Sequence, residues 1–139
     1  MSKIKFAVIG AGHIGKRHAE MVQRNEQTEL SAMCDIRSRE ECGVAEDIPF
    51  YSTPEEMLQH EEVDVVCVCT PNGLHAQHAL FALKAGKHVV VEKPMALNKA
   101  DGEKIIFEAL RANKQVFCVM QNRYSPPSVW MKELIQSGV

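Results

Sequence analysis

Unbroken apolar runs alternate with helical patterns along the whole chain. Apolar residues fill most positions of the segments 3–10, 29–35, 64–70, 87–92 and 115–121, which predicts five strands. Strands that are apolar on both faces are typical of a sheet covered by helices on both sides. The shorter segment 49–51 is expected to add one more strand.

Helix signals lie between these runs. Thr53, Pro54 and Glu56 predict a helix from residue 54 to about residue 59, because threonine caps free amides and proline fits the first helical position. Apolar residues at 74, 79, 80 and 83 recur at helical spacing and stop at Gly86, a typical residue for a helix C-terminus.

Two more helices are predicted in the second half of the chain. Asn98 is expected to cap a helix that Asn113 ends, and Ser125 is expected to begin a final helix that ends at Gly138. The apolar residues of this final helix are expected to face inward: Val129, Trp130, Leu134 and Ile135.

This alternation predicts a doubly wound parallel α/β sheet in one domain. Strand-helix-strand connections of this length require parallel pairing with right-handed crossovers. In such a sheet, ligands bind beyond the carboxyl ends of the strands, so positions 10, 35, 70, 92 and 121 are expected to converge there.

A glycine-rich turn follows the first predicted strand and opens the first predicted helix: Gly10-Ala11-Gly12-His13-Ile14-Gly15. Its first glycine allows a tight turn, its second lets the backbone approach a pyrophosphate, and its third lets helix and strand pack closely. The helix N-terminus adds amides and a positive dipole for the anion. The alternative is that the glycines serve turns alone. The strand, helix and acidic residue in place favour a Rossmann-type dinucleotide site.

Asp35 ends the second predicted strand, about twenty residues beyond the last glycine, where a carboxylate accepts hydrogen bonds from a ribose 2′-hydroxyl. It would repel a 2′-phosphate, which favours NAD over NADP. Arg37 could pair with such a phosphate, so the choice of cofactor stays open at this point. The alternative for Asp35 is a solvated turn residue.

Polar residues follow the later strands. Lys93 lies between Glu92 and Pro94, where it could act on a substrate hydroxyl or carbonyl, or simply begin a polar loop. The loop Thr70-Pro71-Asn72-Gly73-Leu74-His75 would border a nicotinamide ribose. After the last strand, Gln121, Asn122 and Arg123 offer hydrogen bonds and an anion site, or form a solvated loop.

The amino-acid composition limits which classes of binding partner are expected. The formal net charge of −2 lacks the basic excess of a nucleic-acid binder, so a small-molecule partner is expected. The five cysteines lack a C-x-x-C spacing and are expected to be reduced and mostly buried in a cytoplasmic protein. Neither a membrane span nor a metal site is expected, since His75 and His78 share a helix face without a further ligand at suitable spacing. His13 and His18 are expected to lie on a helix without chemistry of their own.

These motifs together resemble the glucose-fructose oxidoreductase, inositol dehydrogenase and rhizopine-catabolism family of nicotinamide-dependent sugar oxidoreductases. The resemblance rests on the glycine turn with Lys16-Arg17-His18, on Cys34-Asp35, on the loop 70–75 and above all on residues 85–94. It implies cofactor contacts from these residues: Gly10, Gly12, His13, Ile14, Gly15, Asp35, Arg37, Thr70, Pro71, Asn72, His75, Glu92, Lys93 and Gln121. The resemblance also implies that Lys93 is the catalytic residue and that Lys93, Asn122 and Arg123 contact the substrate.

The family resemblance further implies a second, mostly antiparallel β domain that this sequence does not contain. We therefore expect residues 1–124 to be the dinucleotide-binding domain and residues 125–139 a helix leading into the substrate domain. The isolated chain is expected to bind cofactor with little turnover, and the full-length enzyme to be a homo-oligomer. The segment 120–127 resembles the branch that oxidises UDP-N-acetylglucosaminuronate at its 3-hydroxyl. Two alternatives stay open, a non-enzymatic NAD-responsive binding module and an NADP-dependent reductase of another carbonyl substrate.

Overall fold

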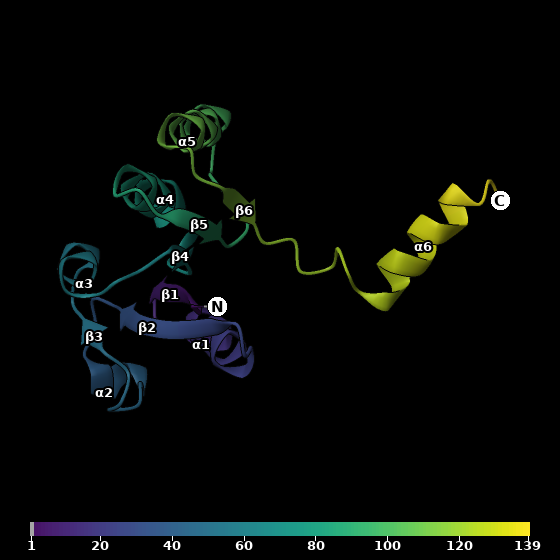
Figure 1. The fold of residues 1–139 in the computed structure, drawn as a ribbon. Coiled ribbons are helices and arrows are strands. Elements are labelled where there is room, and N and C mark those ends of the chain that lie inside the picture. The colour runs from purple at the N-terminus through teal and green to yellow at the C-terminus, as the bar shows by residue number, and fades with distance from the viewer. Residues whose placement is uncertain (1) are drawn as a thin grey trace.

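Six parallel strands form one sheet at the centre of the computed structural model, which describes residues 2–139 (Figure 1). The strands are β1 (Ile4–Ile9), β2 (Thr28–Cys34), β3 (Phe50–Tyr51), β4 (Val65–Val68), β5 (His88–Val91) and β6 (Val116–Cys118). They lie in the order β3-β2-β1-β4-β5-β6, and all neighbours pair in parallel. The strand order reverses between β1 and β4, which confirms the predicted doubly wound α/β sheet.

The helices are α1 (His13–Arg24), α2 (Arg39–Cys42), α3 (Pro54–His60), the 3₁₀ turn η1 (Asn72–Leu74), α4 (His75–Lys84), α5 (Lys99–Ala112) and α6 (Pro126–Gln136). Helices α1 to α5 lie between the strands in the sequence and cover the sheet on both faces, whereas α6 follows the last strand. The predicted N-caps of α3 and α5 are confirmed. The Glu56 amide donates to Thr53 Oγ1 over 3.2 Å, and the Asp101 amide donates to Asn98 Oδ1 over 2.9 Å. Asn113 ends α5 in the left-handed conformation, with a φ of 52°.

The hydrophobic core consists of two clusters, one on each face of the sheet. Val8 of β1 belongs to the cluster that includes Ala19 of α1. Its neighbour Ile9 belongs to the other cluster, with Leu83 of α4 and Ile105 of α5. Successive residues of a strand point to opposite faces, so a strand covered on both sides must be apolar at every position. This explains the unbroken apolar runs and fixes β1 rigidly beneath the turn that follows it.

Some strands are shorter than predicted, and one helix was not predicted. Strand β4 covers four residues of the predicted strand 64–70. The predicted strand 115–121 is shortened to β6, because its partner β5 ends at Val91, which pairs with Cys118. The four-residue helix α2 was not predicted, although Ser38 and Glu41 form a capping box that the S-x-x-E spacing signals.

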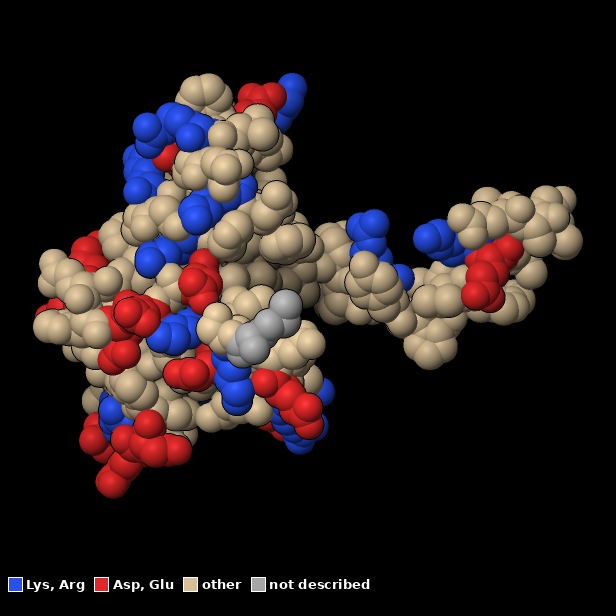
Figure 2. Space-filling model, viewed as in Figure 1, with Lys and Arg blue, Asp and Glu red and all other residues tan. Residues whose placement is uncertain are grey.

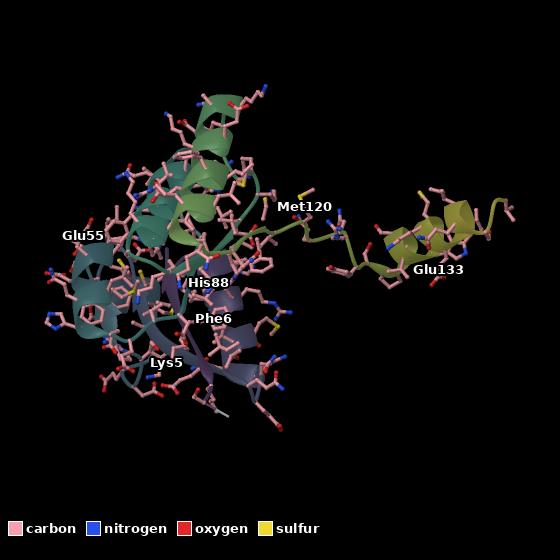
Figure 3. All side chains as sticks on the ribbon, turned by 45° about the horizontal axis from the view of Figure 1, so that its top comes forward. Lys5, Phe6, Glu55, His88, Met120 and Glu133 are labelled. Carbon is pink, nitrogen blue, oxygen red and sulfur yellow. The ribbon has the colours of Figure 1, made fainter. Side chains whose placement is uncertain are left out.

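The prediction that the apolar residues of α6 face inward is wrong for the residues described. Trp130 is 60% exposed and Ile135 71% exposed. Figures 1 and 2 show α6 standing away from the body at the end of an extended segment. In Figure 3, Glu133 of α6 lies beyond Met120, apart from the body. Helical periodicity identifies the apolar face of a helix but not the surface that covers it. Cys118 is likewise exposed, because it lies on the edge strand β6.

Candidate functional site

The glycine turn connects β1 to α1, and its three glycines differ in what requires them. Gly10 has a φ of 97°, and a Cβ there would lie 2.6 Å from the carbonyl oxygen of Cys69, which follows the neighbouring strand β4. A Cβ on Gly15 would overlap the Gly10 carbonyl oxygen. Gly10 therefore makes the turn possible and Gly15 lets α1 approach it, as the sequence predicts.

At position 12, neither the backbone conformation nor the packing requires a glycine. The φ of −74° at Gly12 suits any residue. A Cβ there would meet no atom of the described residues within 4 Å, and the residue faces a cavity. A glycine that the protein itself does not need leaves room for a ligand to approach the backbone. His13 and Ile14, the first residues of α1, line the same cavity, and a helix start leaves its first amides without intrahelical partners.

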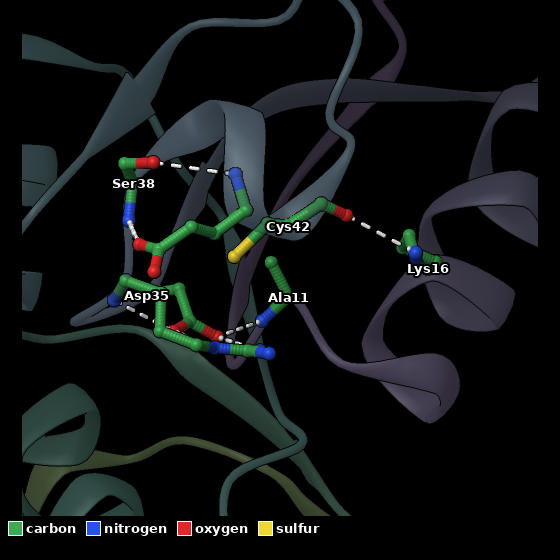
Figure 4. A network of polar contacts seen from close by, with 7 residues as sticks. Ala11, Lys16, Asp35, Ser38 and Cys42 are labelled. Atoms are coloured by element: carbon green, nitrogen blue, oxygen red, sulfur yellow. Dashed lines mark hydrogen bonds and ion pairs between the residues drawn. The ribbon is translucent and has the colours of Figure 1, made fainter.

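Asp35 comes directly after β2, and its carboxylate is held from two sides (Figure 4). Its Oδ2 accepts a hydrogen bond from the Ala11 amide over 2.8 Å. The Arg37 amide and Nε donate to Oδ1 over 3.0 Å each, and a terminal guanidinium nitrogen donates to Oδ2 over 3.0 Å. The Arg37 guanidinium, together with these backbone amides, lowers the pKa of Asp35 to about 2. The group is therefore a fixed anion at neutral pH that also anchors the glycine turn.

A cavity of about 460 Å³ lies beyond the carboxyl ends of β1, β2 and β4. It brings together eight predicted site residues: Gly10, Gly12, His13, Ile14, Asp35, Arg37, Thr70 and Pro71. Ser52 also lines the cavity and was not singled out from the sequence, although it follows the predicted short strand 49–51. Cys34 lines it too, and burial raises the pKa of its thiol to about 12, so this sulfur stays neutral. The cavity has the position, size and fixed charge expected for the adenosine and pyrophosphate of a dinucleotide.

Lys93 lies outside that cavity, in a second, more open hollow of about 510 Å³. Gln121, Asn122 and Arg123 line the same hollow. The sequence placed these residues at one edge of the sheet because they follow the neighbouring strands β5 and β6, and the structure brings them together there. An ammonium, a guanidinium and two amides around one open hollow can donate hydrogen bonds to a polar or anionic group.

His75 and His78 begin α4 and hold the loop that precedes it. His75 is 1% exposed, and its Nδ1 lies 2.8 Å from the Pro94 carbonyl oxygen while its Nε2 lies 2.6 Å from the Thr70 carbonyl oxygen. His78 Nδ1 lies 3.0 Å from Thr70 Oγ1, and burial lowers the pKa of this imidazole. Within residues 2–139, no group of three or more histidine, cysteine or acidic side chains is arranged to hold a metal ion. His75 is thus a bridge beneath the surface, and Asn72 lies in the exposed turn η1 above it.

His18 is a residue whose contact the sequence did not reveal. It lies on α1, and its Nε2 is 2.8 Å from Glu92 Oε1, with both side chains largely buried. The Glu92 side chain therefore contacts His18 of α1 and does not line the main cavity. The pattern of α1 gave only a weak signal, since a histidine on an amphipathic helix more often packs or faces solvent.

Comparisons with known proteins agree with this geometry. A family model described as "Oxidoreductase family, NAD-binding Rossmann fold" and designated GFO_IDH_MocA matches residues 4–120. Myo-inositol 2-dehydrogenase of Thermotoga maritima is 32% identical over 97% of this chain and 41% of its own length. D-glucoside 3-dehydrogenase of Escherichia coli is 32% identical over 99% of this chain and 40% of its own length. The chain thus spans about two fifths of the length of these relatives.

Solved structures show the same likeness. The WlbA dehydrogenase of Bordetella pertussis, crystallised with NADH and UDP-GlcNAcA, has a TM-score of 0.91 and 32% identity over 98% of this chain and 42% of that chain. An NAD-binding protein from Listeria innocua has a TM-score of 0.90 and 29% identity over 99% of this chain and 41% of that chain. No helix within residues 2–139 combines the length and apolar character needed to cross a membrane.

Proposed function

We propose that this chain, which belongs to the GFO_IDH_MocA oxidoreductase family with an NAD-binding Rossmann fold, is the NAD-binding part of a sugar dehydrogenase. The reaction transfers a hydride between the nicotinamide and a secondary hydroxyl carbon of a sugar or sugar nucleotide. The relatives named for inositol, glucoside and UDP-GlcNAcA support this substrate class. The likeness to the UDP-GlcNAcA complex and the segment 120–127 favour a nucleotide-linked uronic acid, oxidised at its 3-hydroxyl.

The observation that carries the proposal is the open space at Gly12. Neither the conformation nor the packing of the protein calls for glycine there, whereas a pyrophosphate at the start of α1 does. The remaining cofactor roles follow from position. His13, Ile14 and Gly15 would supply the first amides of α1. Thr70 and Pro71 would border the ribose beside the nicotinamide.

Asp35 supports NAD over NADP. Its carboxylate is held by Ala11 and Arg37, so it is already oriented when a ribose arrives. A 2′-phosphate would face this fixed negative charge. Arg37, the group that could compensate, is bonded to both oxygens of Asp35 and would have to leave them first.

Lys93 is proposed as the residue that acts on the substrate hydroxyl. When bound, the nicotinamide supplies the hydride chemistry. The Lys93 ammonium would polarise the hydroxyl or stabilise the negative charge that develops on its oxygen. Asn122 and Arg123 would hold polar or anionic groups of the substrate in the same hollow, and Gln121 would bridge this hollow to the cofactor.

We further propose that residues 1–124 act as the dinucleotide-binding domain and that residues 125–139 lead toward a substrate domain. In this arrangement the chain alone would bind NAD but turn over slowly, since orientation of the reacting carbon is worth roughly 7–11 kcal/mol of barrier. The homo-oligomeric state of a longer protein stays a prediction.

Fluorescence titrations with NADH and NADPH test the proposal. We expect saturable NADH binding that is tighter than NADPH binding, and a loss of that preference in Asp35→Ala, which removes the ribose acceptor and frees Arg37. Asp64→Ala is the matched control, because Asp64 also accepts a backbone hydrogen bond, from the Lys5 amide over 2.8 Å, but lies at the opposite end of the sheet. Failure of the folded wild-type chain to bind either dinucleotide would contradict the proposal.

A further inference from the structure

We propose that His18 and His75 are positioning residues that together hold Lys93 in place at the second hollow, beside the main cavity. This inference rests on the proposed function, because it takes Lys93 to lie beside the nicotinamide. It goes further by assigning a role to two histidines that reach Lys93 through its neighbours in the chain.

Lys93 needs such support because its own segment offers little. It follows β5, and residues 92–98 belong to no helix or strand. Its side chain is exposed. A lysine has four flexible side-chain bonds, so its ammonium is directed only as well as its backbone is fixed.

His18 holds the residue before Lys93. Its Nε2 lies 2.8 Å from Glu92 Oε1, and the two side chains are 17% and 14% exposed. The Glu92 amide also donates to the Val68 carbonyl oxygen of β4 over 3.0 Å, so both the backbone and the side chain of Glu92 are fixed. Since His18 lies on α1, this contact ties the helix of the glycine turn to the Lys93 segment.

His75 holds the residue after Lys93. Its ring bridges the carbonyl oxygens of Pro94 and Thr70. Both partners are acceptors, so a doubly protonated ring donates to both and a neutral ring donates to one. Thr70 lines the main cavity, so this bridge links the wall of that cavity to the Lys93 segment.

The two contacts have one consequence. The residues on either side of Lys93 are each held by a histidine, and the two histidines come from helices whose first turns lie at the main cavity. A displacement of the glycine turn or of the Thr70 loop would therefore move Lys93. A role limited to folding would stabilise α1 and α4 without affecting the nicotinamide half of a bound dinucleotide.

Paired titrations with NADH and ADP-ribose separate these roles. ADP-ribose contains the adenosine, pyrophosphate and second ribose but lacks the nicotinamide. We expect His18→Leu to weaken NADH binding about fivefold, the size of one net hydrogen bond, while ADP-ribose affinity changes less than about twofold. His18→Gln should restore NADH affinity, because its amide nitrogen can donate to Glu92. Arg24→Ala is the matched control, since it removes an ion pair to Glu20 near the other end of the same helix.

A double-mutant cycle identifies the group through which His18 acts. If His18 acts by positioning Lys93, then His18→Leu should cause no further loss of NADH affinity in a Lys93→Met background. His75→Gln should follow the same pattern, and because His75 is buried, thermal unfolding must first show that this variant folds. The double-mutant cycle with His18 tests the inference even if His75→Gln does not fold.

Each outcome of these titrations decides the inference. Equal losses for NADH and ADP-ribose, no loss for either, or losses that add in the double variant would each overturn it while leaving the proposed function intact. If wild-type protein binds neither ligand, the proposed function itself fails.

Discussion

Alanine substitutions at Gly12 and Gly15 should affect different properties. Gly12→Ala should weaken NADH binding, and Gly15→Ala should destabilise the fold. At Gly15 an added methyl group would overlap the Gly10 carbonyl oxygen, so backbone must move. Such overpacking typically costs about 1–3 kcal/mol. At Gly12 the methyl group meets no atom of the described residues within 4 Å, and the backbone conformation already suits alanine. The free energy of unfolding should therefore change by less than about 1 kcal/mol.

NADH affinity should fall in Gly12→Ala, the variant whose stability changes little. A methyl group on Gly12 points into the space where a pyrophosphate would approach the amides of α1. Loss of one hydrogen bond to a charged phosphate corresponds to about 1.5–3 kcal/mol, which is about a 10- to 150-fold loss of NADH affinity. Gly15→Ala should instead lower the thermal midpoint by about 3–10 °C.

Thermal unfolding and NADH titration of each variant measure the two effects. Gly102→Ala serves as the control, because Gly102 lies within α5, where alanine favours the helix and the nearest contact of its Cβ, Met95 Cε at 3.6 Å, is ordinary. It should bind NADH as the wild type does. Unchanged NADH affinity in Gly12→Ala would refute the assignment of this turn to the pyrophosphate, and an unchanged midpoint in Gly15→Ala would refute the close approach of α1 to β1.

Three further predictions concern stability and surface chemistry. Because the pKa of Asp35 is lowered to about 2 in the folded protein, its ionised form stabilises the fold above pH 4, and that contribution should be lost as the pH falls from about 4 to 2. After allowance for the exposure of Arg37, the difference in free energy of unfolding between the wild type and Asp35→Asn should therefore shrink by about 1–2 kcal/mol over that range, as urea titrations would show. Ile105→Ala should cost about 2–5 kcal/mol by the same assay, since Ile105 is fully buried, whereas Ile106→Ala, at an exposed neighbour, should cost under about 1 kcal/mol. Cys118 should react with a thiol reagent in the folded protein well before the buried cysteines, and Cys118→Ser should remove this fast phase in a mass-spectrometric time course.

The sheet and the main cavity could be predicted because their signals are local. A strand buried on both faces must be apolar throughout, and a glycine turn between strand and helix has a fixed place in a parallel sheet. Gly10 and Asp35 were therefore located at the same edge from their positions in the chain alone. The extent of β6 could not be predicted in this way, because the strand ends where its partner β5 ends.

The contacts of His18 and the surroundings of α6 depend on the tertiary arrangement. His18 and Glu92 are 74 residues apart in the sequence, and nothing in either local pattern indicates their contact. The apolar residues of α6 follow helical spacing, but spacing cannot say whether a surface lies opposite them. In both cases the missing information was the identity of a distant partner, which a single sequence does not contain.

The hydrogen bond between Asp35 and the Ala11 amide limits how this protein could change its cofactor during evolution or engineering. A change of preference toward NADP would call for replacing Asp35, because a carboxylate at the end of the second strand repels a 2′-phosphate. Here that step would also detach the glycine turn, so the early variants on such a route would hold every dinucleotide less well. A second substitution that anchors Ala11 by other means would have to come first or at the same time. Cofactor preference at this site is therefore expected to change through paired substitutions rather than single ones.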